Sequence, residues 1–244
     1  MPTDANLGEE PASTATGPQP ILAAMKAAEA KKRLVDESVR LIDEQGLGAL
    51  SFREMSRRAG VSHQTPYHHF SNREGILAAI AHEGFVRLNA RLIDAERKYR
   101  PKRQQENLRN LMRAYMHFAI ENPVYYGVMF RPEQVDFARY PEARAQAMLS
   151  FKRLVDAVAA CHPRAAKNDK RIVEVANALW AAAHGVATLW LDGPLGVNLP
   201  GVSIASFIDS SSEMFSQAGA RTTRIAQKRS DKLSAARTTS SRTT

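Results

Sequence analysis

The sequence predicts an all-α protein, and three observations lead to that prediction. Apolar residues recur at steps of three or four positions through most of the 244-residue chain, which is the spacing of one helix face. No stretch shows the sustained alternation of apolar and polar residues that marks a half-buried strand. Glycine or proline follows several of the periodic segments, as is usual where helices end.

The first elements outline a leader and two helices. Residues 1–24 are rich in Pro, Thr, Gly and Ala without periodicity, which predicts a disordered leader. A helix is expected from Lys31 to Gln45, with Gly46 as its stop. The next helix should begin near Ser51, whose hydroxyl is suited to cap its first turn, and should end at Gly60.

A short third helix follows, so that residues 25–75 have the outline of a three-helix, helix-turn-helix domain. Pro66 lacks a backbone amide, which is tolerable only near the first turn of a helix. The third helix must therefore begin close to Ser62 and stay short.

A larger helical domain is predicted for residues 76–218. Ser71 and Glu74 have the spacing of a capping box, which opens a long helix to about Arg100. Asn168 is the expected cap of a strongly apolar helix, and Ser203 the expected cap of the last one. The expected helices span residues 71–100, 106–121, 124–130, 142–161, 169–191 and 203–215, with a Gly/Pro loop at 193–201.

The net charge of +9 belongs mostly to the C-terminal tail. Residues 219–244 carry seven Lys and Arg against one Asp, so this tail contributes +6 and the body only +3. Its composition predicts a basic disordered tail, which is either a solubilising terminus or a nonspecific anchor for nucleic acid.

The composition also limits the compartment. The single cysteine, Cys161, excludes an internal disulfide and a multi-cysteine zinc site, and suits a reducing cytoplasm. The N-terminus has no apolar signal core, and the longest apolar run, residues 178–191, falls short of the roughly 20 residues of a membrane helix. We expect a cytoplasmic protein with no membrane partner and no cofactor.

Residues 62–70 combine a polar side with an apolar side, as a recognition helix in a DNA major groove requires. His63, Gln64 and Thr65 lie at its start, where base contacts are usually made, and Gln64 is suited to bidentate recognition of adenine. The residues expected to bond phosphates are Ser51, Tyr67, His68 and His69.

Each of the three arginines in the preceding helix has two interpretations. Arg53 is suited to a guanine or a phosphate; the alternative is a surface salt bridge, and we favour the DNA role. Arg57 and Arg58 have the alternative of facing solvent or pairing with Glu54.

Four motifs then give a family resemblance. They are Leu-Ser-Phe-Arg at 50–53, Arg-Arg-Ala-Gly-Val-Ser at 57–62, Tyr-His-His-Phe at 67–70 and Ser-Asn-Arg-Glu at 71–74. Their order and spacing resemble the DNA-binding domain of the tetracycline-repressor-like (TetR) transcriptional regulators. Pro66 stands where the wider family commonly has an aliphatic residue. The resemblance implies DNA contacts by Arg53, His63, Gln64, Thr65, Tyr67, His68 and Arg73.

The C-terminal half resembles a subgroup of that family. The spacing of Trp180, His184 and Gly185 and the run Glu-Asn-Pro-Val-Tyr-Tyr at 121–126 resemble the region called the WHG domain. The family resemblance implies that residues 76–218 bind an effector in an apolar pocket and form a homodimer through the last two long helices. The small residues near Gly185 are compatible with that interface, and equally with packing inside one subunit.

Bulky apolar residues of the central helices are the candidates for the effector pocket. Such residues at helical spacing are also what an ordinary core contains, and His184 has the alternative of a satisfied core histidine. The candidates are Met112, Tyr115, Met116, Phe118, Tyr125, Met129, Phe130, Met148, Trp180 and His184.

An enzyme is not expected. Cys161 and His162 are adjacent in sequence, which does not place their side chains face to face, and a DNA-facing role accounts for the three histidines of residues 63–69 as well as a metal site does. The prediction is a homodimeric, sequence-specific transcriptional repressor, released from a palindromic double-stranded operator by a small-molecule effector. The alternative is a helical interaction module without ligand-gated DNA release.

Overall fold

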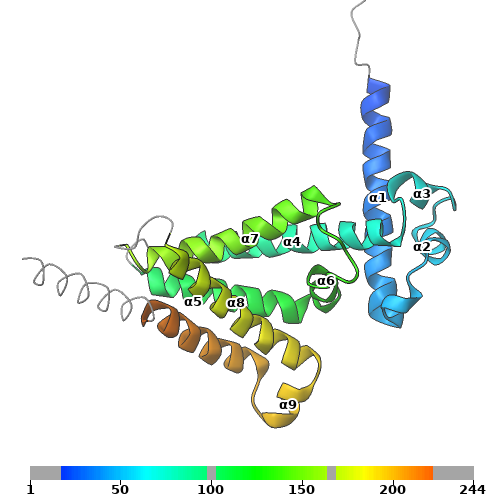
Figure 1. Ribbon diagram of the computed structural model, residues 1–244. Helices are drawn as coiled ribbons and strands as arrows, with labels where there is room; N and C mark the ends of the chain where they lie inside the picture. Colours follow the sequence, from blue (N-terminus) through cyan, green and yellow to red (C-terminus); the bar gives the residue numbers. More distant parts are fainter. Residues whose placement is uncertain (1–17, 98–102, 164–168, 222–244) are drawn as a thin grey trace, which may run out of the picture. The chain divides into compact units, whose positions relative to one another are not determined.

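The computed structural model describes residues 18–97, 103–163 and 169–221, and its regular structure in these ranges is helical throughout (Figure 1). The all-α prediction is therefore confirmed for the described residues. The chain divides into two compact units, residues 1–70 and 71–244. The predicted leader up to residue 17 and the predicted tail from residue 222 lie outside the described residues.

The described part of the first unit, residues 18–70, contains three α-helices and one short 3-10 helix. These are α1 (Pro18–Gln45), η1 (Leu47–Ala49), α2 (Phe52–Ala59) and α3 (Thr65–His69). Leu34, Leu41 and Met55 are completely buried where α1 packs against α2. The buried Ser38 hydroxyl lies 2.7 Å from the carbonyl oxygen of Leu34, to which it donates, so this small polar residue is satisfied inside the core.

Helix α1 begins at Pro18 instead of Lys31, so the prediction of a disordered leader to residue 24 is wrong for residues 18–24. Residues 21–29 are exposed and have no partner face among the described residues, which is why an apolar stripe did not reveal them. They consist of Ala, Leu, Ile, Met, Lys and Glu, most of which are strong helix formers. Intrinsic propensity, instead of burial, therefore accounts for this part of the helix.

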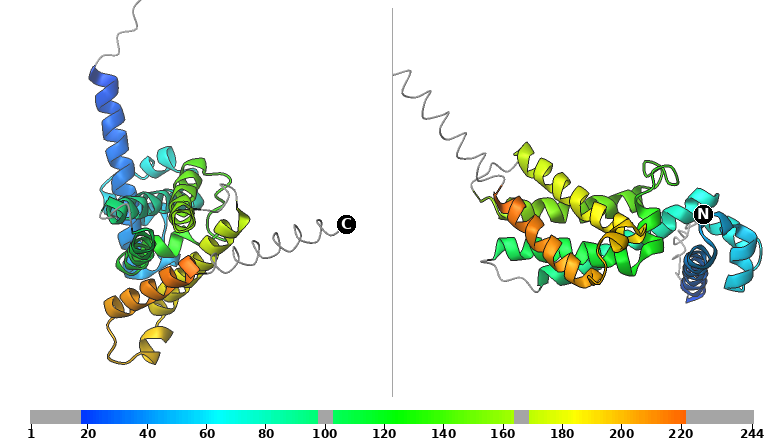
Figure 2. Two further views of the ribbon diagram at one scale, coloured as in Figure 1. Left: turned by 90° about the vertical axis from the view of Figure 1, so that its left-hand side faces the viewer. Right: turned by 90° about the horizontal axis from the view of Figure 1, so that it is seen from below.

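The second unit is organised around α4, which packs against α5, α6 and α7. Helix α8 lies against α5 and α7, and a final helix spans residues 204–221, here called the terminal helix. Figure 2 shows α8 and the terminal helix running back alongside each other. The bounds are α4 (Arg73–Arg97), α5 (Gln104–Glu121), α6 (Pro123–Met129), α7 (Pro141–Ala160), α8 (Lys170–Leu191) and α9 (Pro194–Asn198).

The terminal helix is longer than predicted. Ser203 caps it as expected, because its hydroxyl oxygen accepts from the Ser206 amide at 3.2 Å. The helix continues past the predicted end at Phe215, and Gly219, assigned to the tail, is buried. A Cβ at Gly219 would lie 2.9 Å from a terminal methyl of Leu179, so a larger residue here would require that side chain to shift.

One predicted cap and one predicted loop are wrong. The side chain of Asn72, not of Ser71, accepts from the Gly75 amide at 3.0 Å at the start of α4. Asp169 caps α8 and accepts from the Arg171 amide at 3.0 Å, and Asn168, the predicted cap, lies outside the described residues. The predicted Gly/Pro loop contains the short helix α9, because a proline in the first turn is compatible with a helix.

Glu74 has a different role from the predicted capping box. One of its carboxylate oxygens accepts from the Asp136 amide at 3.0 Å, and the other from the Arg139 guanidinium at 2.7 Å. Both partners belong to residues 131–140, here called the α6–α7 loop. The first turn of α4 is thus tied to a loop that is distant in sequence.

Helix α8 is long and apolar enough to cross a membrane by length and composition, a criterion that core helices of soluble proteins also meet. The apolar run at 178–191 is extended by Ile172, Val173 and Val175, which makes it longer than the sequence analysis counted. Ile172, Ala176 and Leu179 are buried within the second unit. The buried share of the most apolar 18-residue window of α8 is 28%.

Candidate functional site

Helix α2 has the predicted ends. The Ser51 hydroxyl oxygen accepts from the Glu54 amide at 3.3 Å, and Gly60 closes the helix with a φ of +63°, a conformation that glycine adopts without strain. Since Ser51 uses its oxygen as an acceptor, its hydroxyl hydrogen remains free to donate outward.

Helix α3 is short, as Pro66 predicts. It begins at Thr65, slightly later than the expected Ser62, and Pro66 lies in its first turn, where no intrahelical bond is lost. Pro66 is also buried and anchors the helix to the unit. His63 and Gln64 lie in the turn before the helix, and the Gln64 carbonyl accepts from the Tyr67 amide at 3.1 Å.

Most of the predicted DNA-contacting side chains are exposed on this unit. Tyr67 is 62% exposed, and its ring lies edge-to-face against Phe52 with centroids 4.6 Å apart. This contact holds an aromatic ring at the surface, where its hydroxyl is available. The exposed members are Ser51, Arg53, His63, Gln64, Tyr67 and His68, and Thr65 is half-buried.

Two predicted members differ from the rest. His69 is partly buried, and burial, followed by the charges of Lys31 and His68, lowers its pKa below 6.5. Its imidazole is therefore neutral near pH 7 and brings no positive charge to a phosphate. Arg73 belongs to the second unit, where its guanidinium donates to the Gln134 side-chain oxygen at 3.3 Å.

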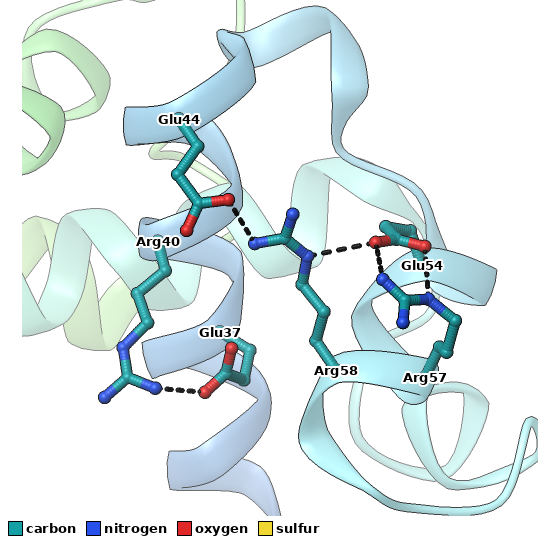
Figure 3. Close-up of polar contacts among 6 residues, drawn as sticks. All are labelled: Glu37, Arg40, Glu44, Glu54, Arg57 and Arg58. Carbon is teal, nitrogen blue, oxygen red and sulfur yellow. Dashed lines mark hydrogen bonds and ion pairs between the residues drawn. The ribbon is translucent and has the colours of Figure 1, made fainter.

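Arg57 and Arg58 are both engaged with carboxylates, which resolves the alternative left by the sequence (Figure 3). Arg58 donates to Glu44 on α1 at 2.7 Å and to Glu54 at 3.0 Å, so it links α1 to α2. The two guanidiniums beside Glu54, that of Arg57 first, lower its pKa to about 2. Arg53 is exposed on α2 and makes no ion pair with any described residue, whereas the exposed Arg57 is paired with Glu54.

The second unit contains a cavity of about 390 Å³, within the size range of ligand sites, that opens to solvent where its lining residues Asn177 and Trp180 are exposed. Helices α4 to α8 and the α6–α7 loop all contribute to its wall. The lining residues are Phe85, Leu88, Leu92, Leu111, Met112, Tyr115, Met129, Phe130, Pro132, Phe137, Ala147, Ser150, Phe151, Leu154, Asn177, Trp180 and Ala183.

The predicted effector residues divide into two groups. Met112, Tyr115, Met129, Phe130 and Trp180 line the cavity. The other five do not line the cavity and are not part of the candidate site. Met116 and Phe118 are buried on α5, Tyr125 lies under the Arg87 guanidinium, Met148 is 61% exposed on α7, and His184 contacts Tyr115.

Several lining residues were missed by the sequence analysis. Phe85, Leu88 and Leu92 were recognised as one face of a long helix, but their spacing does not distinguish a cavity wall from a filled core. Pro132 and Phe137 lie in an irregular segment that has no periodicity to interpret.

A polar cluster lies behind Tyr115. The His184 Nδ1 atom is 2.9 Å from the Tyr115 hydroxyl and 2.8 Å from the Tyr126 hydroxyl, and Trp180 donates to Tyr115 at 3.3 Å. Tyr126 also lies 3.0 Å from the Thr188 hydroxyl. Burial raises the pKa of Tyr115 and Tyr126 and lowers that of His184, so the cluster is uncharged at neutral pH.

The cluster predicts a pH dependence of stability. Burial lowers the pKa of His184 below 6.5 in the folded protein. As the pH falls below 6.5, the His184 imidazole of the unfolded chain is therefore protonated before that of the folded chain, and the free energy of unfolding decreases. For His184→Gln, the difference in Tm from the wild type should be largest at about pH 7.5 and shrink toward about pH 5.5.

Thermal unfolding followed by circular dichroism would measure this difference at each pH. His63→Gln, which removes an exposed imidazole from the other unit, is the control for a general effect of losing a histidine. A difference that stays constant across the range would contradict the role assigned to His184.

Cys161 and His162, the residues considered for an enzyme, lie at the C-terminal end of α7. Burial raises the pKa of the Cys161 thiol to about 11, and the His162 Nε2 atom lies 3.1 Å from the carbonyl oxygen of Gly219. Within the described ranges, no group of three His, Cys, Asp or Glu side chains is placed to hold a metal ion.

The chain combines a helix-turn-helix unit with a helical unit that has an apolar cavity. This arrangement is typical of transcriptional regulators that carry a DNA-binding unit and a ligand-binding unit in one polypeptide. Residues 34–80 match the family described as "Bacterial regulatory proteins, tetR family", and residues 108–232 match "Tetracyclin repressor-like, C-terminal domain". The chain belongs to this tetracycline-repressor-like (TetR) family. The finer resemblance to the WHG subgroup stays a prediction.

One curated relative is an uncharacterized HTH-type transcriptional regulator, YobS, of Bacillus subtilis (strain 168). It is 28% identical over 96 residues, which are 39% of this chain and 49% of the relative. The chain thus matches about half the length of that protein.

Solved structures share the fold. A protein of unknown function from Rhodococcus sp. RHA1 is 25% identical, with a TM-score of 0.63 over 78% of this chain and 94% of that one. The TetR family regulator PfmR of Thermus thermophilus is 19% identical, with a TM-score of 0.58 over 76% and 97%. The regulator FadR of Bacillus subtilis, solved with stearoyl-CoA, is 14% identical, with a TM-score of 0.59 over 75% and 96%.

Proposed function

We propose that this protein is a cytoplasmic, homodimeric transcriptional repressor that leaves a palindromic operator when a small-molecule effector enters the cavity. The observation that carries the proposal is the set of polar side chains exposed around α3, the short helix that follows the turn of the helix-turn-helix. Family membership supports the same interpretation.

Base reading is assigned to the start of α3. His63 and Gln64 in the turn and Thr65 at the first helical position occupy the end of a recognition helix that meets base edges. The Gln64 amide provides a donor and an acceptor, which suits adenine. Phosphate contacts are assigned to Ser51, Arg53, Tyr67, His68, His69 and Arg73, with His69 as a neutral donor.

A homodimer is supported by the outer face of α8. A Cβ placed on Gly185 would meet no described atom within 4 Å, so no contact with the described part of the subunit requires glycine there. Glycine in a helix interior costs about 1 kcal/mol relative to Ala, and a partner helix would supply the missing packing reason. Val173 and Leu189 on α8 and Met214 on the terminal helix are 44%, 49% and 59% exposed.

Effector control is supported by the α6–α7 loop. Its residues Pro132 and Phe137 line the cavity, and the same loop is held by Glu74 in the first turn of α4. A ligand that displaces Phe137 would therefore act on the helix that follows α3 in the sequence. In FadR, the shared fold accommodates a small molecule.

The proposal is tested by titrating the purified protein into DNA from upstream of its own gene at physiological salt. The wild type should give a saturable shift that resists nonspecific competitor. Gln64→Ala should cost about 1–3 kcal/mol of specific binding. Arg53→Ala should weaken binding and reduce the slope of log K against log salt by about 1.

Arg57→Ala is the matched control, because Arg57 lies on the same helix but is held by Glu54. It should change specific binding less than Arg53→Ala does. An unchanged shift in both Gln64→Ala and Arg53→Ala would overturn the assigned sites. A complete lack of specific binding would favour the helical interaction module instead.

A further inference from the structure

Among the described residues, the wall of the cavity carries no charged side chain. Its lining contains no Asp, Glu, Lys, Arg or His, and four residues, Tyr115, Ser150, Asn177 and Trp180, provide its side-chain polar groups. An ionised group that entered this space would lose its hydration without an opposite charge to replace it. The cavity therefore disfavours anions, and the only attraction that it offers a cation is that of its aromatic ring faces.

Polar groups of the wall are largely engaged with the protein itself. The Ser150 hydroxyl donates to the carbonyl of Ala147 at 2.8 Å, and the Trp180 indole donates to Tyr115 at 3.3 Å. Asn177 uses one amide hydrogen for the carbonyl of Val173 at 2.8 Å. Few donors remain for a carboxylate or phosphate, which needs several of them when no cation is present.

Aromatic rings form a continuous chain along the wall. Phe137 contacts Phe85, and Phe85 contacts Phe130, with centroid separations of 6.1 and 5.6 Å. Trp180 continues the chain from Phe130 at 6.0 Å and contacts Phe151 at 6.1 Å. These are the separations of favourable aromatic pairs, and an added planar ring would extend the chain.

We infer that the effector of this protein is an uncharged, predominantly aromatic molecule. The inference rests on the proposed function, because it names the ligand class of the same cavity. Such a ligand replaces water against ring faces and the sulfur atoms of Met112 and Met129, which make favourable contacts with aromatic rings.

The test uses isothermal titration calorimetry of the full chain with four probes. Three share one ring system and differ in charge at neutral pH: 2-naphthol is neutral, 2-naphthoate anionic and 2-naphthylmethylamine cationic. The fourth, 1-decanol, is neutral but aliphatic. 2-Naphthol should bind at least about tenfold more tightly than either charged probe, and more tightly than 1-decanol.

A pair of variants tests the location. Ser150→Arg places a guanidinium on the cavity wall and should raise the affinity for 2-naphthoate about tenfold or more while lowering that for 2-naphthol. Met148→Arg adds the same charge on the same helix outside the wall, because Met148 is 61% exposed, and should change neither affinity. Circular dichroism verifies that both variants are folded.

The inference is overturned if a charged probe binds within tenfold of 2-naphthol, if 1-decanol binds more tightly, or if 2-naphthol does not bind up to its solubility limit. It is also overturned if Met148→Arg reproduces the effect of Ser150→Arg. Failure of the proposed function is a separate result: saturable 2-naphthol binding with no effect on the operator shift would contradict effector release and leave the ligand class intact.

Discussion

If the proposed homodimer forms through α8, Gly185→Arg should convert it to a folded monomer and abolish the proposed specific operator binding. A Cβ at Gly185 meets nothing within 4 Å in the described part of the subunit, so a side chain can leave the helix there without a clash at its first carbon. In a symmetric dimer each subunit presents the same surface to the other, so the substitution appears twice in the interface. Two guanidiniums buried there without a partner charge would drive the two α8 helices apart. Operator affinity should fall about 10³-fold or more, to the nonspecific level.

Size-exclusion chromatography with light scattering would measure the oligomeric state, and the DNA titration the loss of binding. Gly185→Ala is the conservative control and should remain a dimer. Met148→Arg, which places the same charge at an exposed position of α7, should also remain a dimer. If Gly185→Arg stays dimeric, the interface lies on another face.

Gly84→Val should lower the free energy of unfolding by about 1–3 kcal/mol, the usual range for inserting carbon atoms into a packed core. A Cβ at Gly84 would lie 2.5 Å from the Met129 sulfur and 3.2 Å from the Tyr125 Cβ. Met129 is almost completely buried and lines the cavity, so its displacement should also weaken ligand binding.

Chemical denaturation followed by circular dichroism would measure the loss. Gly127→Ala on α6 is the matched control, because a Cβ there meets no described atom within 4 Å and helix propensity alone should raise stability by up to about 1 kcal/mol. A Gly84→Val protein as stable as the wild type would show that α4 and α6 separate without cost.

The sequence identified the elements whose signals are local. Ser51 and Gly60 predicted the ends of α2, and Pro66 predicted a short α3, because a cap, a left-handed glycine and a missing amide each act within one helical turn. The start of α1 was missed because its prediction relied on an apolar stripe. The exposed first turns of this helix have no such stripe, and their helical structure follows from the intrinsic helix propensity of their residues.

The candidate sites were predictable to different degrees. The DNA-facing set comes from one short segment with specific motifs, and the structure exposes Arg53, Gln64 and Tyr67 as expected. Only half of the predicted effector residues line the cavity, because periodicity identifies an apolar helix face but does not say whether that face meets another helix or an empty space.

The sequence by itself determined the helical class, the helix-turn-helix segment and the family, since these depend on residues close together in the chain. Only the tertiary structure decided that Glu74 holds a loop some sixty residues away, with contacts to Asp136 and Arg139. It also decided that Gly84 is enclosed and Gly185 open, although both are glycines inside long helices. The physical reason is that close packing and cavities arise where helices converge, and neither distance nor space is encoded in the periodicity of any one helix.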